Sequence, residues 1–284
     1  MPNHVRNVLT LDGSAEDIKA IVEQFGTVVE RHHNKTYDGR LICQRKDKDG
    51  MEYGWHDEEK HEFSYRSNGK VIDTTIINNK IPEGWEYDMV ETFTQFPDFQ
   101  KVLPAPEGLD IESGSLGDNA YTLLFGSDKQ FISTNELQKR FSELSEEQMR
   151  KSVDLAIKYF MNEQKYGYRT WYEWNSEHWG TKWNSYDCEQ VSDNEFIWDT
   201  AWSCVYKLIK VMSEAFPEVI FRYEYSDEDT GSNCGTMTIM GGSKVVERIP
   251  VSGSKEAYDL AFKHRPDNQE YYKLVDGNWT SKED

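Results

Sequence analysis

The 284-residue sequence lacks the motifs of several familiar classes of enzyme and metalloprotein. It contains no Gly-x-Gly-x-x-Gly, no phosphate-binding loop and no Gly-x-Ser-x-Gly, so nucleotide-dependent and serine-hydrolase chemistry have no motif to support them. The four cysteines, Cys43, Cys188, Cys204 and Cys234, form no C-x-x-C pair, so neither a zinc ribbon nor an iron–sulfur cluster is indicated. We therefore expect no catalytic residue, metal site or cofactor, and favour a binding protein over an enzyme.

Long apolar runs are missing as well. No stretch approaches the ~20 apolar residues that a membrane span needs, and the N-terminal segment holds no apolar signal core. Cysteines without a pairing pattern are typical of a reducing compartment. These features predict a cytoplasmic protein that does not enter a membrane.

Positive charge is scarce, with 32 Lys and Arg against 51 Asp and Glu and a formal net charge of -19. Such a surface repels phosphate and anionic lipid, and no Lys/Arg run is long enough to form a local basic patch. Direct nucleic-acid binding is therefore unfavourable. On the simpler interpretation the acidic surface serves solubility; on the sharper one it engages a basic partner, such as a protein that normally holds DNA.

Aromatic residues are abundant, at 13% of the chain. Six of the nine tryptophans fall within 32 residues, at Trp171, Trp174, Trp179, Trp183, Trp198 and Trp202. Disordered chains have few aromatics, so we expect a folded protein with a very polar surface. Because large aromatics dominate both cores and interfaces, this segment is either the structural centre of the chain or its contact surface.

Residues 179–187 (WGTKWNSYD) allow two interpretations. As a binding surface, their aromatic side chains stack on a ligand or partner while their polar side chains orient it. As part of the core, they form a strand in which Trp179 and Trp183 share one face and Gly180 allows a bulge. We favour the core for the tryptophans, although packing does not require the polar residues between them. The candidate ligand- or partner-binding residues are Trp179, Lys182, Trp183, Asn184, Tyr186, Asp187 and Trp202.

Other polar clusters have plainer explanations. His56 and His61 are separated by five positions, not the four that place two zinc ligands on one helix face, so we expect a solvated charged loop. The adjacent His32 and His33 are expected at the surface. The acidic segment 227–233 lacks the alternating ligands of an EF-hand and is predicted to be a polar hairpin connection.

The first half of the chain opens with a predicted strand at 5–11 and a helix that Ser14 caps and Gly26 ends. Residues 27–97 contain short apolar stretches between turn pairs and predict an irregular, β-containing insertion. Pro104 and Pro106 predict an extended segment, and 111–120 a loop.

Two capping-box patterns predict the helices that follow, Ser133 with Glu136 and Ser145 with Gln148. The second helix should end near Gly167. Its expected core-facing stripe is Val153, Ala156, Ile157, Phe160 and Met161.

The last third alternates strands and helices more clearly. Strands are expected at 196–202, 219–225, 236–240, 244–249 and 271–275. Helices are expected at 205–216, before Pro217, and at 254–262, before Pro266. The order β-α-β-β-(β)-α-β is the split β-α-β arrangement of a ferredoxin-like antiparallel sheet with helices on one face.

Several patches carry a resemblance to a known family. They are residues 1–9 (MPNHVRNVL), 99–107 (FQKVLPAPE) and 179–187, followed by Thr200–Ser203 and by Phe216-Pro217. These patches resemble the YubB-like uncharacterised family, which is encoded by bacteriophages, prophages and plasmids and has a C-terminal ferredoxin-like domain. In this chain Cys204 follows Ser203 where the family has proline. The resemblance implies a mobile-element origin, the cytoplasm of a bacterial host and the ferredoxin-like fold, and it implies no activity.

Together these observations predict an α+β protein. Residues 1–170 should hold the β-α unit, the β-rich insertion at about 27–97 and helices at about 133–166, and residues 171–284 the tryptophan-rich segment and the ferredoxin-like domain. We expect the opening β-α unit to dock onto the same core.

Three functions follow, in order of preference. The first is an accessory protein of a phage or plasmid that binds a host or mobile-element protein through its acidic or aromatic surface, in one version as a DNA mimic. The second is a small-molecule or nucleotide-binding protein with a pocket near 179–187. In one version it is a weak enzyme. The third, a nucleic-acid-handling protein, is disfavoured by the net charge.

Overall fold

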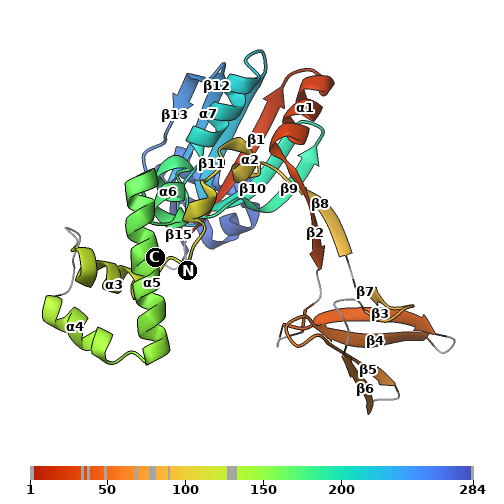
Figure 1. Ribbon diagram of the computed structural model, residues 1–284. Coiled ribbons are helices and arrows are strands. Elements are labelled where there is room, and N and C mark those ends of the chain that lie inside the picture. Colours follow the sequence, from red (N-terminus) through yellow and green to blue (C-terminus); the bar gives the residue numbers. More distant parts are fainter. Residues whose placement is uncertain are drawn as a thin grey trace. The chain divides into compact units, whose positions relative to one another are not determined.

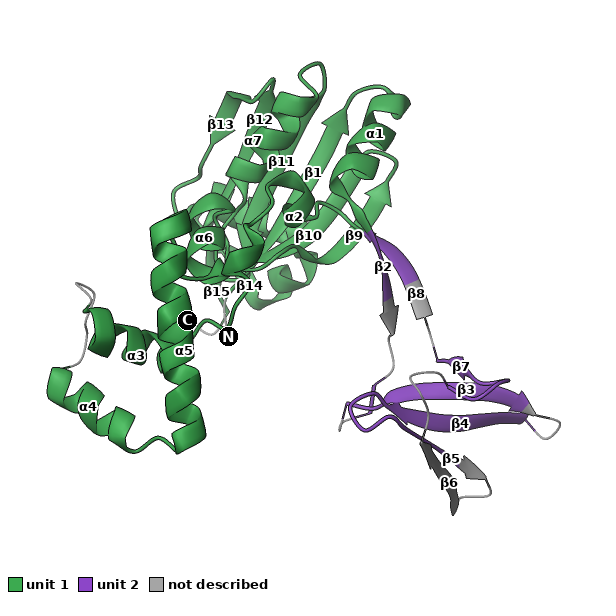
Figure 2. Cartoon of the chain, in the orientation of Figure 1, with its two compact units in different colours: residues 1–27, 95–284 green, residues 28–94 purple. Residues whose placement is uncertain are grey.

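The computed structural model describes residues 3–32, 35–36, 39–47, 50–67, 70–76, 81–88, 90–126 and 133–282. The chain forms two compact units (Figure 2): Met1–Thr27 with Gln95–Asp284, and Val28–Thr94. The units therefore divide on either side of the insertion and not at residue 170. The reason is that the first strand of the chain pairs with strands of the last third.

The larger unit is built on a six-stranded antiparallel sheet in the order β13-β12-β11-β1-β10-β9 (Figure 1). In chain order its strands are β1 (His4–Asp12), β9 (Tyr186–Ser192), β10 (Glu195–Ala201), β11 (Ile220–Asp227), β12 (Cys234–Met240) and β13 (Ser243–Arg248). The loop between β11 and β12 is the hairpin connection predicted at 227–233.

Four of these strands make the ferredoxin-like core. β1 is followed by helix α1 (Ala15–Phe25) and β10 by helix α7 (Tyr206–Ala215). The sequence β1-α1-β9-β10-α7-β11 with the sheet order β11-β1-β10-β9 is the split β-α-β arrangement, although the prediction assigned that arrangement to the elements of 196–275. The opening β-α unit thus supplies the first half of the core, and β1 lies between β10 and β11.

The closing strand behaves differently from the prediction. β14 (Tyr272–Val275) pairs with β15 (Asn278–Ser281) in a separate two-stranded sheet. It therefore adds nothing to the six-stranded sheet, and the ferredoxin-like core closes with β11 instead.

Alternation along the strands explains which face is buried. Val5, Leu9 and Leu11 of β1 are fully buried and face Phe221 and Tyr223 of β11 in one hydrophobic core with α1 and α7. α1 begins where predicted, because the Ser14 hydroxyl accepts a hydrogen bond from the backbone N–H of Asp17 (3.1 Å).

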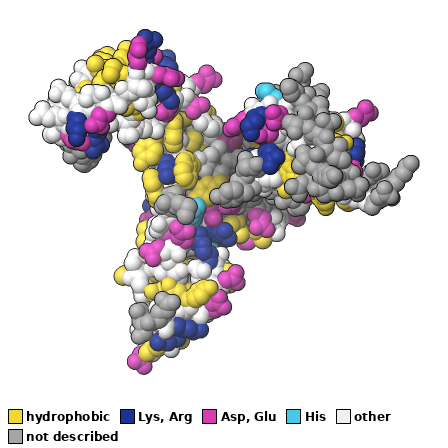
Figure 3. Space-filling model, turned by 90° about the horizontal axis from the view of Figure 1, so that it is seen from below, with side chains coloured by type: hydrophobic (Ala, Val, Ile, Leu, Met, Phe, Trp, Pro, Cys, Tyr) yellow, Lys and Arg dark blue, Asp and Glu magenta, His cyan; other side chains and the backbone are white. Residues whose placement is uncertain are grey.

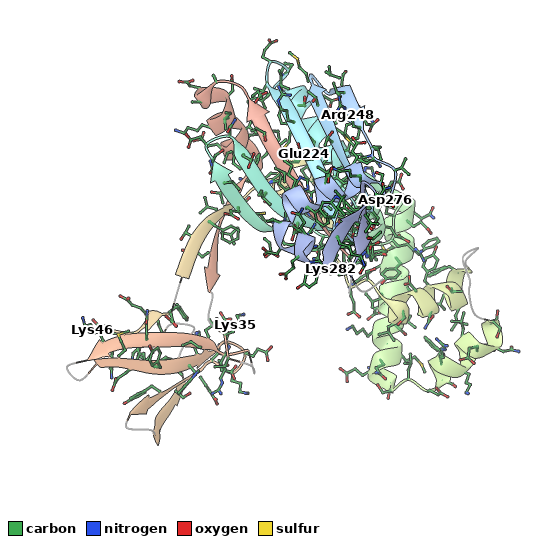
Figure 4. All side chains as sticks on the ribbon, turned by 180° about the vertical axis from the view of Figure 1, so that it is seen from behind. Lys35, Lys46, Glu224, Arg248, Asp276 and Lys282 are labelled. Atoms are coloured by element: carbon green, nitrogen blue, oxygen red, sulfur yellow. The ribbon has the colours of Figure 1, made fainter. Side chains whose placement is uncertain are left out.

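The opposite face of the sheet carries α8 (Lys255–His264), which is followed by the 3₁₀ helix η2 (Pro266–Tyr271). Glu224, labelled in Figure 4, and Ser226 alternate with the buried tyrosines of β11 and contact His264 of α8. The helices therefore lie on both faces, not on one, because the even-numbered residues of β11 offer α8 hydrogen-bonding partners.

Residues 98–178 are mainly helical. The elements are α2 (Phe99–Val102), the 3₁₀ helix η1 (Glu107–Leu109), α3 (Ser115–Phe125), α4 (Thr134–Ser142), α5 (Glu146–Tyr166) and α6 (Trp171–His178). The capping box at Ser145 and the left-handed C-cap at Gly167 (φ 79°) are confirmed. None of the helices in the described ranges is long and apolar enough to cross a bilayer.

Two expectations for this segment are wrong. The predicted loop at 111–120 is a helix from Ser115 onward. Residues 179–187, a strand in the core interpretation, instead form a turn at Gly180 (φ 84°) and become strand only from Tyr186, after the helix Trp171–His178. Burial of Trp174 against the core outweighs the weak helix propensity of aromatic residues.

The core-facing stripe of α5 is shifted. Ser152, Leu155, Ala156 and Tyr159 are buried, whereas Ile157, Phe160 and Met161 are exposed. Both stripes have helical spacing, so the pattern alone does not choose between them. Helix α3 determines which stripe is buried, because Tyr159 of α5 packs closely against Gly117 of α3. Even a Cβ at Gly117 would lie 2.7 Å from the Tyr159 ring.

The smaller unit contains two sheets, and the larger of them is antiparallel. One has the order β6-β5-β4-β3-β7, and the other pairs β2 with β8. Their strands are β2 (Thr27–His32), β3 (Leu41–Asp47), β4 (Gly50–Asp57), β5 (Glu62–Ser67), β6 (Lys70–Ile76), β7 (Glu86–Tyr87) and β8 (Val90–Gln95). The insertion is therefore mostly regular sheet.

A small core of Cys43, Phe63 and Trp85 holds the larger of these sheets together, and burial raises the pKa of the Cys43 thiol to about 12. His56 lies in β4 and is buried, with its Nδ1 2.8 Å from the Tyr87 hydroxyl, so the expected charged loop is wrong at this residue. Some residues named in the predictions lie outside the described ranges. They are the side chain of His32, all of His33, and residues 38, 49, 68 and 69, which belong to the turn pairs of the insertion.

Candidate functional site

A groove of about 550 Å³ in the larger unit runs along the tryptophan-rich segment. We call it the tryptophan groove. One wall comes from α6 and the residues after it: Trp171, Asn175, Trp179, Lys182, Trp183 and Asn184. The facing wall comes from residues around the two prolines: Gln100, Ala105, Pro106, Glu107 and Asp110. Its volume falls within the ~300–1,000 Å³ typical of ligand pockets.

Lys182 holds two exposed tryptophans together at the rim of this groove. Its Nζ lies 3.8 Å from the ring centroid of Trp183 and 4.1 Å from that of Trp202. The two rings are 40% and 43% exposed, although a tryptophan with only a packing role is normally buried. A cation between two aromatic faces fixes the position of both rings.

Trp202 also has an unusual backbone. Its φ is 70°, in the left-handed region that costs a bulky residue of order 1 kcal/mol or more. The conformation is held by its N–H, which donates to the Asn3 carbonyl (2.9 Å), and by its carbonyl, which accepts from Asn233 Nδ2 (3.0 Å). The fold therefore holds Trp202 in an unfavourable backbone conformation that leaves its ring exposed.

Asn184 has a structural role that its position in the motif does not reveal. Its Oδ1 accepts from the backbone N–H groups of Phe99 (2.8 Å) and Ser185 (2.9 Å), and its Nδ2 donates to Asp98 Oδ1 (2.8 Å). The Ser185 hydroxyl donates to the Pro97 carbonyl (2.6 Å). These bonds fasten the segment after Gly180 to residues 97–99 and so fix the two walls of the groove.

Trp179 and Asn175 form the buried part of the groove. Trp179 is 2% exposed, contacts Phe99 edge-on and donates from Nε1 to the Leu103 carbonyl (2.8 Å), as the core interpretation requires. Asn175 donates from Nδ2 to the Lys182 carbonyl (2.9 Å). Its Oδ1 is buried and has no hydrogen-bond partner among the described residues.

The last two candidates lie beside the groove and do not line it. The Tyr186 ring contacts Trp183 (centroids 6.4 Å apart), and its hydroxyl lies 2.7 Å from His4 Nδ1. Burial raises the pKa of this phenol above its usual range. Asp187 is exposed on β9 with a φ of 50°, and it adds negative charge near Arg6.

The structure therefore brings together four candidates in the groove, Trp179, Lys182, Trp183 and Asn184, with Trp202 against Lys182. Sequence reasoning missed Asn175, Glu107 and Asp110. The Pro-x-Pro segment was a signal for the two acidic residues, since it precedes them directly. No sequence signal marks Asn175, whose place in the lining of the groove depends on the turn of α6.

A second hollow of about 900 Å³ lies among α3, α5 and α6. Its cation, Arg169, is paired with Glu173 (2.6 Å) and Asp118 (3.6 Å). Tyr121 donates to Glu163, and burial with this carboxylate raises the pKa of the Tyr121 phenol to about 12. Because these polar groups bond to each other, the hollow offers a ligand less than the tryptophan groove does.

A chain of hydrogen bonds joins Ser226 and Glu224 of β11 to His264 of α8. Ser226 Oγ is 2.9 Å from His264 Nδ1, and His264 Nε2 is 3.0 Å from Glu224 Oε2. The hydrogen bond from His264, with the nearby Lys263, lowers the pKa of Glu224 to about 2. Ser226 is fully buried, so its hydroxyl cannot attack a substrate, and the three residues fasten α8 to the sheet.

Metal ligation has no candidate in the described ranges, which hold no group of three or more His, Cys, Asp or Glu side chains placed to bind an ion. All four cysteines are described, and none of them forms a disulfide.

Comparison with known proteins supports the fold. Residues 178–265 match the model of a family described as the ferredoxin-like domain in Api92-like protein. This match confirms an α+β protein with a ferredoxin-like domain at its C-terminal side. The crystal structure of protein api92 from Yersinia pseudotuberculosis covers 89% of this chain and 99% of its own, at 9% identity and a TM-score of 0.33. No curated protein matches the chain by sequence.

Proposed function

We propose that this protein acts by binding another protein at the tryptophan groove. The observation that carries the proposal is the pair of exposed rings, Trp183 and Trp202, held by Lys182 beside a concave surface. Tryptophan is the residue most enriched among those that dominate binding energy at protein interfaces. Rings that are already fixed lose little conformational freedom when a partner arrives, which favours affinity.

The charge of the chain supports a basic partner. The net charge is -19. Two of the acidic side chains, Glu107 and Asp110, are exposed and line the groove on the wall that faces the tryptophans. Opposite charge on the partner speeds association and disfavours acidic competitors. Figure 3 shows Lys and Arg side chains among the Asp and Glu over the face in view. This mixture supports the aromatic groove over DNA mimicry, which needs a surface of one sign.

The groove also has the size for a small molecule, which keeps that alternative as the second candidate. Two observations favour a protein instead. Asp187, expected to help orient a ligand, does not line the groove, and Asn184 uses its polar atoms to hold the walls. A nucleotide would bring phosphate charge against Glu107 and Asp110.

The setting of this interaction forms part of the proposal. We propose a partner encoded by the host or by a mobile element, met in the bacterial cytoplasm. Four described cysteines without a disulfide support a reducing compartment, and the sequence patches that resemble the YubB-like family support the mobile-element origin.

Affinity capture from host cells tests the proposal with three forms of the full chain: unmodified, Trp183→Ala and Tyr271→Ala. Tyr271 is an exposed aromatic outside the groove and serves as the matched control. We expect one specific partner that Tyr271→Ala retains and Trp183→Ala loses by about tenfold or more, as truncation of a central interface tryptophan does. Equal capture by all three forms, with each shown to be folded by circular dichroism, would contradict the proposal.

A further inference from the structure

The chemistry of the tryptophan groove narrows what kind of partner side chain it accepts. Three features of the groove are relevant: aromatic faces, two carboxylates and a buried carbonyl oxygen without a donor. Each of them is satisfied by the same type of guest. We propose that the groove receives an arginine side chain presented by a basic segment of the partner. This assignment rests on the proposed function.

The aromatic faces favour a flat cation. Trp171 and Trp183 line the groove, and the Trp183–Trp202 pair already holds the ammonium of Lys182 at its rim. A guanidinium stacks on an indole ring and is more weakly hydrated than an ammonium, so it loses less on leaving water. The ammonium of Lys182 is itself part of the lining and opposes a second cation, so the carboxylates of the groove must outweigh its charge.

The facing wall supplies the opposite charge. Glu107 and Asp110 are exposed and stand at either end of the short helix η1. A carboxylate accepts two parallel hydrogen bonds from a guanidinium, which is the strongest geometry available to such a pair. A phosphate or carboxylate guest would instead be repelled at this wall.

The floor of the groove has an acceptor that lacks a donor. Asn175 is 5% exposed, and its Oδ1 is buried without a hydrogen-bond partner among the described residues. An unsatisfied buried carbonyl destabilises the protein, and a guest N–H that reached it would remove that penalty. Because the atom is covered when the groove is empty, the guest must displace a neighbouring side chain. A guanidinium carries five N–H donors and no acceptor, so one of its N–H groups can supply the hydrogen bond that this oxygen lacks.

Calorimetric titration of the full chain tests the assignment with capped nine-residue Gly/Ser peptides that carry three arginines, three citrullines or three glutamates. Citrulline keeps the shape of arginine and removes its charge. We expect binding of the arginine peptide, at least about tenfold weaker binding of the citrulline peptide, and a further loss as salt is raised. The glutamate peptide should not bind. Equal binding of the arginine and citrulline peptides would overturn the assignment, as would the absence of binding by the arginine peptide.

Matched variants locate the site. Glu107→Gln/Asp110→Asn should weaken the arginine peptide about tenfold, because two charges leave the groove. The control Asp267→Asn/Glu270→Gln changes the net charge equally on the exposed helix η2 and should leave binding within about twofold. Equal losses in both variants would show a diffuse charge effect and overturn the assignment.

The failure of this inference can be separated from failure of the proposed function. If the arginine peptide does not bind while Trp183-dependent capture of a protein persists, the groove binds a partner through other side chains. If both are absent, the proposed function is itself wrong.

Discussion

Replacing Asn184 with alanine should destabilise the larger unit strongly, although this side chain lies in a motif that resembles a binding surface. Three hydrogen bonds disappear together, two accepted from the backbone of Phe99 and Ser185 and one donated to Asp98. Phe99 is fully buried, so water cannot easily reach the N–H that loses its partner. Asp98 is the N-cap of α2, so the start of that helix loses support as well.

The magnitude follows from these bonds. A buried donor left without an acceptor costs about 1–3 kcal/mol, and loss of a hydrogen bond to a carboxylate costs about 1.5 kcal/mol more. We therefore expect Asn184→Ala to lower the free energy of unfolding by about 3 kcal/mol. With a urea dependence of about 2–3 kcal/mol per molar, the midpoint should fall by roughly 1 M.

Urea unfolding followed by tryptophan fluorescence measures this change. The control is Asn268→Ala, which removes one partly buried hydrogen bond to Thr230 and should cost less than about 1 kcal/mol. A midpoint for Asn184→Ala within 0.2 M of the control, taken as roughly the precision of the linear extrapolation, would refute the structural role of this residue.

Three further changes have defined outcomes. Gly117→Ala places a Cβ 2.7 Å from the Tyr159 ring and should cost about 1–3 kcal/mol by urea titration; an unchanged midpoint would contradict the tight packing of α3 on α5. His264 holds the pKa of Glu224 near 2, below its usual 4.5, so this pair stabilises the fold above about pH 4.5 and its contribution is lost as the pH falls towards 2. Glu224→Gln should therefore show a flatter fall in unfolding free energy over that range, and a fall parallel to the unmodified chain would count against the pair. Trp202→Gly relieves a left-handed backbone but removes a ring from Lys182, so partner capture should fall about tenfold with stability changed by less than about 1 kcal/mol; retained capture would remove Trp202 from the binding surface.

The predicted helix ends were reliable because capping depends on residues that are close together in the sequence. Ser14 and Ser145 cap helices where their patterns predicted, since each hydroxyl needs only an N–H three residues on. Gly167 ends α5 because glycine adopts the left-handed conformation at little cost. The ferredoxin-like topology was also recognisable, because its strands alternate between buried and exposed residues.

Long-range choices could not be made from the sequence. The insertion of β1 between β10 and β11 pairs residues as far apart in the chain as Val5 and Asp227, and no local pattern encodes it. The face of α5 that is buried depends on Gly117, in another helix. Packing of Trp174 against the core decided that α6 is a helix.

The sequence singled out several residues that line the groove, but it did not reveal what each of them does. The motif drew attention to Lys182 and Trp183, whose side chains meet at the rim of the groove. It did not distinguish Asn184, which holds the walls together, from a residue that contacts a partner. That distinction depends on Asp98 and Phe99, which lie about 85 positions earlier in the chain.

Site-specific photo-crosslinking inside host cells tests the central claim most directly. A photoreactive phenylalanine analogue would replace Trp183 in one form of the full chain and the control Tyr271 in another. If the tryptophan groove binds a partner protein, position 183 should yield one defined crosslinked product that position 271 does not. No product at 183, or the same products at both positions, would contradict the account.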